Sequence, residues 1–385
     1  MNKKTAIILL LGIIGASNSF AAQVSESRAR AIASEFFNVN MPVKPATMKA
    51  HGNNAAYYVF NNPEQPGWVI IAGDDRARQI LAYGDEDYFD AADVPDCIQD
   101  WLDTYAMQIA GIDGATTHHS ANYAPTQSLA ASSKSRIAPM LTSNWAQGLP
   151  FNQQCATTTE GGSNYCPAGC VAIAMAQILY YYKSGTQCVA IPGYTSQRLN
   201  RYMPALPATI FNYSVMNDWY ENEVNNSTSA QETAKLVRYC AQSVQMNFGV
   251  NSSSATSQRN AFVYYFGFDK DAMQHSRTDY NANDWENMVY TELAGGRPVY
   301  ISARKESGGH AFICDGYENG LFHINWGWRS HQNGYFALNA LSDGNAGGTG
   351  AASGEEGYTI NVQIMTGLQP STGSTPVPTA TVLQY

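Results

Sequence analysis

The chain has 385 residues, of which 44% are hydrophobic and 14% charged, and its formal net charge is −9. This length accommodates two domains with filled cores, and the composition, with 24 tyrosines and 32 glycines, is that of a globular, loop-rich protein and not of a fibrous or disordered one. The negative charge argues against nucleic acid or an anionic membrane as the main partner, because both require a basic surface.

The N-terminus predicts a secretory signal peptide over residues 1–21. Lys3 and Lys4 precede an apolar run at residues 6–16, and small residues lead to a cleavage site after Ala21. The run is too short for a permanent membrane-spanning helix, and no later stretch is apolar enough to cross a bilayer. We therefore expect export to the periplasm or the extracellular space, with no membrane partner.

Residues 22–115 predict a small α+β domain. Apolar residues at helical spacing predict a helix over 25–37, and β-rich runs separated by turn residues predict strands at 57–60, 68–72 and 80–83. A second helix begins near Pro95, and its apolar face consists of Ile98, Trp101, Leu102, Tyr105 and Ile109.

Residues 116–136 are polar and predict a linker that a protease can cut, with activation placed near Lys134 and Arg136. The second domain, residues 137–367, has its helices first and its strands last, which predicts an α+β fold with helices packed on an antiparallel sheet. Its expected helices are 170–182 and 230–244, and its expected strands are 298–303, 311–317, 321–326, 334–338 and 358–365. Residues 343–357 are expected to form a mobile loop, and residues 368–385 a flexible tail.

Cys170 stands out as a candidate nucleophile because small residues precede it and an apolar helical face follows it. At a helix N-terminus, unpaired N–H groups and the helix dipole stabilise an anion, which raises the thiolate fraction of a cysteine. The alternative is a buried core cysteine or one half of a disulfide with Cys166.

His310 is the candidate base. It follows the glycine turn 308–309 and opens an apolar strand, from which it can project toward a helix N-terminus. Asn325 and Trp326 lie in the next predicted strand, where an Asn carbonyl can orient the imidazole and a Trp can shield it from water. The sequence leaves open which of the two positions His310, and an ordinary surface or core histidine is the alternative.

Gln147 completes the set, because a Gln amide and the backbone N–H of the nucleophile can together hold an oxyanion. Gln, Cys, His and Asn occur here in the chain order of papain-like peptidases. The cysteines and histidines match no zinc spacing, so we expect neither a metal nor a cofactor.

The second domain resembles the streptopain family of bacterial cysteine peptidases, which have a papain-like fold. The matching stretches are PMLTSNWAQGLPFN, GCVAIAMAQIL, SGGHAFICDGY and FHINWGW. The resemblance implies that Cys170 is the nucleophile, His310 the base and Gln147 the oxyanion donor, and that Trp326, with Asn325 beside it, positions His310. It also implies that residues 246–256 flank the substrate cleft and that the second subsite prefers a hydrophobic side chain.

The first domain is similar to the streptopain-type propeptide, on the strength of GWVIIAGDDRARQILAYGDEDYF and the helix around Trp101. The resemblance implies a monomeric zymogen that acts on proteins or peptides and is inhibited by its own propeptide until that domain is removed. A catalytically silent binding or inhibitor protein is the alternative function, and an acyltransferase on the same scaffold is another.

The chain has seven cysteines, so at least one is unpaired in a compartment that favours disulfides. Cys155 and Cys166 bracket a short loop and are candidates to pair. A bond between Cys166 and Cys170 would instead give an oxidised, silenced enzyme.

Overall fold

The computed structural model describes residues 23–40, 43–51, 54–114, 134–183, 187–255, 258–305, 308–341 and 360–372. The expected signal peptide, most of the linker, the loop 343–357 and the end of the tail lie outside these residues. Within the described part of the chain, no helix has both the length and the apolar character needed to cross a membrane.

The N-terminal domain is a four-stranded antiparallel meander with a helix at each end of its sequence. Its elements are α1 (Glu26–Phe37), β1 (Lys44–His51), β2 (Asn54–Asn61), β3 (Trp68–Ala72), β4 (Ile80–Gly84) and α2 (Asp96–Gly114). Ser25 caps α1, since its hydroxyl accepts from the backbone N–H of Arg28. Strands β3 and β4 are almost wholly buried, which is why they read as continuous apolar runs.

The C-terminal domain has a helical part and a sheet part, as expected. Its helices are α3 (Cys170–Tyr182), α4 (Thr228–Ser243), α5 (Gln258–Phe266) and α6 (Ala282–Ala294), with short 3-10 turns η1 (Tyr213–Val215) and η2 (Arg277–Asp279). Its sheet strands are β9 (Met273–Ser276), β10 (Val299–Lys305), β11 (Gly308–Glu318), β12 (Leu321–Asn325), β13 (Gly334–Phe336) and β14 (Ile360–Thr366). Two ribbons, β5 (Gln187–Cys188) with β8 (Thr209–Ile210) and β6 (Tyr194–Ser196) with β7 (Arg201–Met203), lie beside the helices.

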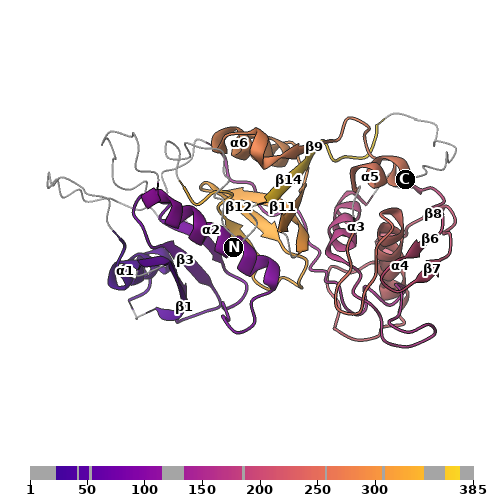
Figure 1. The fold of residues 1–385 in the computed structure, drawn as a ribbon, viewed down its shortest axis with the longest axis horizontal. Coiled ribbons are helices and arrows are strands. Elements are labelled where there is room, and N and C mark those ends of the chain that lie inside the picture. Colours follow the sequence, from indigo (N-terminus) through magenta and orange to yellow (C-terminus); the bar gives the residue numbers. More distant parts are fainter. Residues whose placement is uncertain are drawn as a thin grey trace.

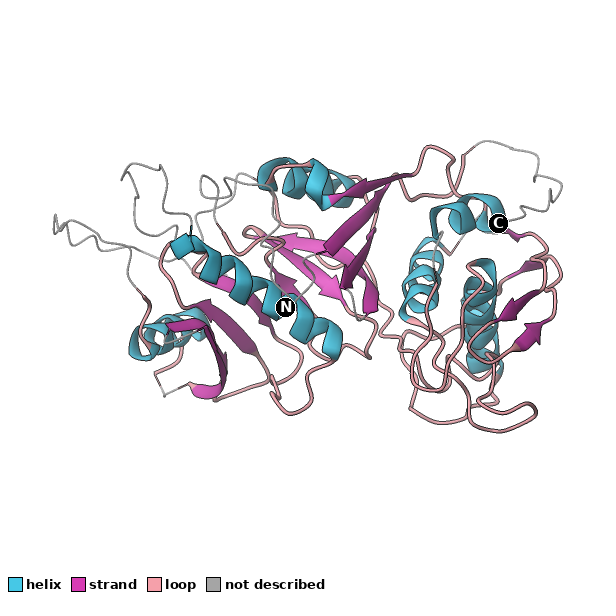
Figure 2. Ribbon diagram, in the orientation of Figure 1, coloured by secondary structure: helices cyan, strands magenta, loops and turns pink. Residues whose placement is uncertain are grey.

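Figures 1 and 2 show α3, α4 and α5 grouped at one end of the molecule, the strands of the C-terminal domain in the middle and the N-terminal domain at the other end. Helix α3 is buried along most of its length, from Val171 to Tyr180, because it packs against α4 on one side and β11 on the other. This packing brings the first residue of α3 close to the end of the sheet at which β11 begins.

The two domains share one sheet, which the sequence did not predict. The strand order is β1-β2-β3-β4-β13-β12-β11-β10-β14-β9, with β4 and β13 antiparallel across the domain boundary. Tyr335 pairs with Tyr83 and Phe336 with Ala82. The N-terminal domain is therefore attached by backbone pairing as well as by side chains.

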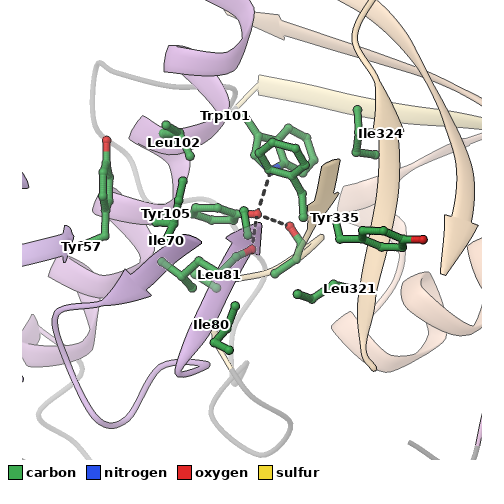
Figure 3. Packing of buried hydrophobic residues seen from close by; sticks show 14 of the residues in the cluster. Tyr57, Ile70, Ile80, Leu81, Trp101, Leu102, Tyr105, Leu321, Ile324 and Tyr335 are labelled. Carbon is green, nitrogen blue, oxygen red and sulfur yellow. Dashed lines mark hydrogen bonds between the residues drawn. The ribbon is translucent and has the colours of Figure 1, made fainter. Parts of the chain in front are cut away.

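Helix α2 lies across this junction. Figure 3 shows the hydroxyl of Tyr105, which donates to the main-chain carbonyl of Leu81 or Ala337, the latter at 2.6 Å, and accepts from the indole N–H of Trp101 at 3.0 Å. The ring of Trp101 makes an edge contact with Phe312 of the C-terminal domain. One buried aromatic cluster therefore spans both domains.

Ion pairs reinforce the boundary. The guanidinium of Arg78 contacts both carboxylate oxygens of Glu286, at 2.7 and 2.9 Å, and donates to the carbonyl of Gly320. Lys305 lies 2.5 Å from a carboxylate oxygen of Asp100, which is buried. Both pairs are shielded from water, so losing one partner would leave a charge that is poorly solvated.

Helix α6 was missed because its segment is rich in polar residues. Its buried side chains nevertheless follow a helical period, with Trp285, Val289 and Leu293 four residues apart. Helix α5 and strand β1 were also missed. Neither has the simple alternation or period that identifies an isolated element.

Candidate active site

Cys170 is the first residue of α3, as the sequence predicted. The preceding residue, Gly169, has φ +90°, a conformation that favours glycine. A Cβ at this position would lie 2.6 Å from Cε of Met246, so a larger residue would also have to displace the end of that side chain. The loop around Met246 also contacts the chain before the nucleophile, since the hydroxyl of Ser253 donates to the carbonyl of Pro167.

The thiol of Cys170 lies in an environment that favours the thiolate. Burial by itself raises its pKa, but the neighbouring imidazole of His310 and the backbone N–H groups of Ala311 and Val171 lower it by more. The N–H of Val171 is one of the unpaired donors in the first turn of α3. The helix start, the strand start and the imidazole thus act together on one sulfur.

His310 is buried on β11, with 8% of its surface exposed. Its Nε2 lies 2.9 Å from the main-chain carbonyl oxygen of Trp326. A carbonyl only accepts, so Nε2 carries a proton and Nδ1 is the nitrogen left to face a thiol. Burial by itself lowers the pKa of His310, but the sulfurs of Cys97 and Cys170 raise it well above its usual range.

The question between Asn325 and Trp326 has an unexpected answer. The amide of Asn325 donates to the carbonyl of Ser143 and exchanges hydrogen bonds with Gln177, and its oxygen accepts from the N–H of Gly327. These contacts tie α3 to the turn after β12. The group that hydrogen-bonds His310 is the main-chain carbonyl of Trp326. The side chain of Asn325 instead hydrogen-bonds the neighbouring loop residues Ser143 and Gly327.

The aromatic shield on His310 is Trp328, two residues beyond the expected tryptophan. The rings of Trp328 and His310 are nearly parallel, with centroids 6.1 Å apart and planes at 16°. The ring of Trp326 instead packs against Phe312 and Phe336 in the core. In an extended segment, residues two apart lie on the same face, so the sequence pattern cannot distinguish the positions of Trp326 and Trp328. The turn that follows β12 separates them.

Gln147 lies beside the nucleophile's loop. Its carbonyl oxygen accepts from the N–H of Ala168, two residues before Cys170, at 2.9 Å. The adjacent Ala146 forms an isolated β-bridge with Trp328. Gln147 is partly exposed, and these backbone contacts hold it next to both Cys170 and the shield of His310.

Cys97, in the first turn of α2, reaches this site from the N-terminal domain. Its sulfur accepts a hydrogen bond of 3.2 Å from the indole N–H of Trp328. Cys97 also raises the pKa of the His310 imidazole, as does Cys170. Sequence reasoning missed Cys97, and its position as the single cysteine of residues 22–115 was the available signal.

All seven cysteines are free thiols in the structure, including the candidate pairs Cys155 with Cys166 and Cys166 with Cys170. Burial raises the pKa of Cys155 to about 12, and it also raises that of Cys166. Among the residues that the structure describes, no three His, Cys, Asp or Glu side chains are arranged to hold a metal ion.

Family models match both domains of the chain. The peptidase C10 family model matches residues 145–336, and the Spi protease inhibitor model matches residues 21–109. The chain is 31% identical over 397 residues to the thiol protease/hemagglutinin PrtT of Porphyromonas gingivalis, which covers 95% of this chain but 44% of PrtT. This chain therefore spans less than half the length of that relative.

A second relative matches over its whole length. Streptopain of Streptococcus pyogenes is 27% identical over 398 residues, covering 93% of this chain and 98% of streptopain. Among solved structures, a fragment of prointerpain A from Prevotella intermedia superposes with a TM-score of 0.66 at 23% identity, covering 86% of this chain and 99% of that chain. The likeness confirms the expected fold class, a papain-like α+β domain preceded by a smaller α+β domain.

Proposed function

Because this chain belongs to the peptidase C10 family and begins with a domain of the Spi protease inhibitor type, we propose that it is a cysteine endopeptidase synthesised as an inhibited precursor. The observation that carries the proposal is the pairing of Cys170 with His310. The sulfur lies at the start of α3, and the imidazole is held by the carbonyl of Trp326. Each partner favours the charged form of the other.

In the proposed acylation step, the thiolate of Cys170 attacks the scissile carbonyl carbon and forms a tetrahedral intermediate. The side chain of Gln147 and the backbone N–H of Cys170 donate to the oxyanion. The C–N bond then breaks while the imidazolium of His310 gives its proton to the leaving amine, which leaves a thioester on Cys170.

Deacylation reverses these roles. Neutral His310 takes a proton from water, and the resulting hydroxide attacks the thioester carbonyl. The C–S bond breaks, the new carboxylic acid leaves, and the Cys170 thiolate and imidazolium are restored. Since Trp328 lies against one face of the imidazole, it limits the access of bulk water to the ion pair.

The N-terminal domain is proposed to act as an intramolecular inhibitor. Support comes from the continuous sheet through β4 and β13 and from the approach of Cys97 to His310. Removal of this domain would expose the site to protein or peptide substrates, for which the preference for a hydrophobic side chain in the second subsite stays a prediction. Export through the signal peptide and a monomeric state are also part of the proposal.

The test is peptidase activity of the mature protein with Cys170→Ala, and Cys166→Ala as the matched control four residues away. Cys170→Ala should abolish both peptide hydrolysis and labelling by iodoacetamide or an epoxide probe at neutral pH, whereas Cys166→Ala should keep both. A mature protein whose Cys170 does not react would indicate a silent binding protein. Labelling with acyl transfer but no hydrolysis would indicate an acyltransferase.

A further inference from the structure

The position of Cys97 is unusual for a buried cysteine. Buried thiols usually behave as small apolar groups within one core. Cys97 is 5% exposed, but its sulfur is bonded to Trp328 of the other domain. A serine, asparagine or alanine would also fit a polar domain boundary, so the placement of a thiol here calls for a chemical reason.

His310 connects this thiol to the nucleophile. The sulfurs of Cys97 and Cys170 both raise the pKa of its imidazole, and the ring of Trp328, which donates to Cys97, lies parallel to the same imidazole. Both sulfurs therefore lie on the His310 side of the domain boundary, which makes them candidates for a direct bond. Cys97 comes from the first turn of α2, in the other domain.

We propose that Cys97 and Cys170 form a disulfide in the precursor, so that the inhibitory domain is locked covalently onto the active site until a thiol reductant opens it. The inference rests on the proposed function, because it uses the reactivity of Cys170 as the nucleophile. It adds a redox control to the removal of the N-terminal domain by proteolysis.

The chemistry is two thiol–disulfide exchanges with a low-molecular-weight disulfide such as oxidised glutathione. The thiolate of Cys170 attacks one sulfur of the small disulfide, which breaks its S–S bond and releases one thiolate. The imidazolium of His310 gives its Nδ1 proton to this released thiolate. Neutral His310 then accepts the proton of Cys97, whose thiolate attacks the Cys170 sulfur of the mixed disulfide and releases the second thiolate, which takes that proton back from His310. Two protein thiols are oxidised and one small disulfide is reduced to two thiols.

The order of these steps follows from the surroundings of the cysteines. Cys170 is partly exposed and its pKa is lowered, so it is suited to attack first. Cys188, Cys240 and Cys314 are buried, and burial raises the pKa of each, so they compete poorly. An oxidising compartment outside the cell, as proposed for this protein, would favour the locked form.

The test uses the full-length precursor carrying Gln147→Ala, which loses the proposed oxyanion donor and so should process itself slowly but keeps both thiols and His310, beside the wild type. Each is treated with oxidised glutathione and N-ethylmaleimide, nicked in the linker with chymotrypsin, for which Tyr123 is a site, and run on gels with and without dithiothreitol. We expect the two fragments to stay together without reductant and to separate with it. Mass spectrometry should find a peptide pair joined through Cys97 and Cys170.

Two variants sharpen the result. Cys97→Ser should release the fragments from each other in both gels, whereas Cys166→Ser should behave as the parent does. The proposal is overturned if Cys170 carries only glutathione or maleimide and no Cys97 pair forms in either precursor. Circular dichroism of each variant establishes that the comparison is made on folded protein.

Activity separates this inference from the proposed function. Nicked, oxidised wild type should be inactive and should recover on reduction, with release of the N-terminal domain. If reduced, nicked Cys97→Ser hydrolyses peptides but the wild type never cross-links, the disulfide is wrong and the peptidase stands. If the reduced form neither hydrolyses peptides nor alkylates at Cys170, the peptidase itself is wrong.

Discussion

The indole N–H of Trp328 in the catalytic domain donates a 3.2 Å hydrogen bond to the sulfur of Cys97 in the inhibitory domain. Trp328 also lies parallel to the imidazole of His310. The domain boundary therefore passes beside His310, the proposed catalytic base. Changes on either side of it should alter inhibition and catalysis in ways that can be separated.

Trp328 donates a hydrogen bond to Cys97 and covers His310 with its ring, and two substitutions should separate these effects. Trp328→Phe keeps a ring over His310 but loses the N–H, so it should weaken the hold of the inhibitory domain by about 1 kcal/mol, roughly fivefold. Trp328→Ala also loses the ring and should lower kcat of the released enzyme by up to about tenfold. Inhibition constants and kcat measured on both variants check this. Equal kcat losses in the two would contradict it.

Arg78 should be needed for tight inhibition. It forms a forked ion pair with Glu286 across the boundary, and truncating one partner of a shielded pair costs about 3 kcal/mol, roughly 150-fold in affinity. After the linker is cut, the Arg78→Ala protein should release its inhibitory domain at protein concentrations at which the wild type still holds that domain. Arg28→Ala, on the exposed surface of the same domain, is the control. Dilution followed by peptidase assay measures the difference.

Cys170 should alkylate at a pH below that of an ordinary thiol. Its pKa is lowered against the effect of burial by His310, so the thiolate appears as pH rises through this lowered value. His310→Ala removes the imidazolium and should move the profile to higher pH, with alkylation at pH 6 slower by at least about tenfold. Iodoacetamide rates against pH on the reduced, released enzyme test this. Superimposable profiles would argue against the ion pair.

The activation cleavage should fall before Lys134. Residues from Ser135 onward are held on the catalytic domain, since Ser135 accepts from the hydroxyl of Tyr290 and Ile137 bridges to Tyr317. A protease needs an unbonded, extended backbone, which this stretch does not offer. N-terminal sequencing of the mature form should therefore start at or before Lys134. A start beyond Ile137 would show that the stretch detaches during activation.

Stability should depend on the pair of His323 and Asp315, whose atoms are 2.5 Å apart. Burial by itself lowers the pKa of His323, but Asp315 raises it by more, so the folded pKa exceeds the unfolded one. This contribution is complete below the unfolded value of about 6.5 and is lost as pH rises through the folded pKa.

Urea unfolding at pH 6 and pH 8 measures this contribution. The wild type should lose stability between the two pH values, and Asp315→Asn should lose less. Asp315→Asn should also destabilise the protein at pH 6 by about 3 kcal/mol, since a buried partner is removed. If Asp315→Asn loses as much stability between pH 6 and pH 8 as the wild type does, the pH dependence comes from other groups.

The sequence by itself determined the local parts of this protein. The apolar face after Cys170 identified the helix, and the glycine turn before His310 identified the start of β11, because these signals depend on residues close together in the chain. The same holds for the α+β character of each domain. The apolar pattern of a helix or strand can be recognised in the sequence because it depends only on residues that are close together in the chain.

Only the tertiary structure decided how these parts meet. The pairing of β4 with β13, the choice of the Trp326 carbonyl over the Asn325 amide, and the approach of Cys97 to His310 join segments that are far apart in sequence. Backbone groups are the same in every residue, so a main-chain acceptor leaves no sequence signal. The thiol of Cys97 could be seen in the sequence, but its partner was set by the docking of one domain on the other.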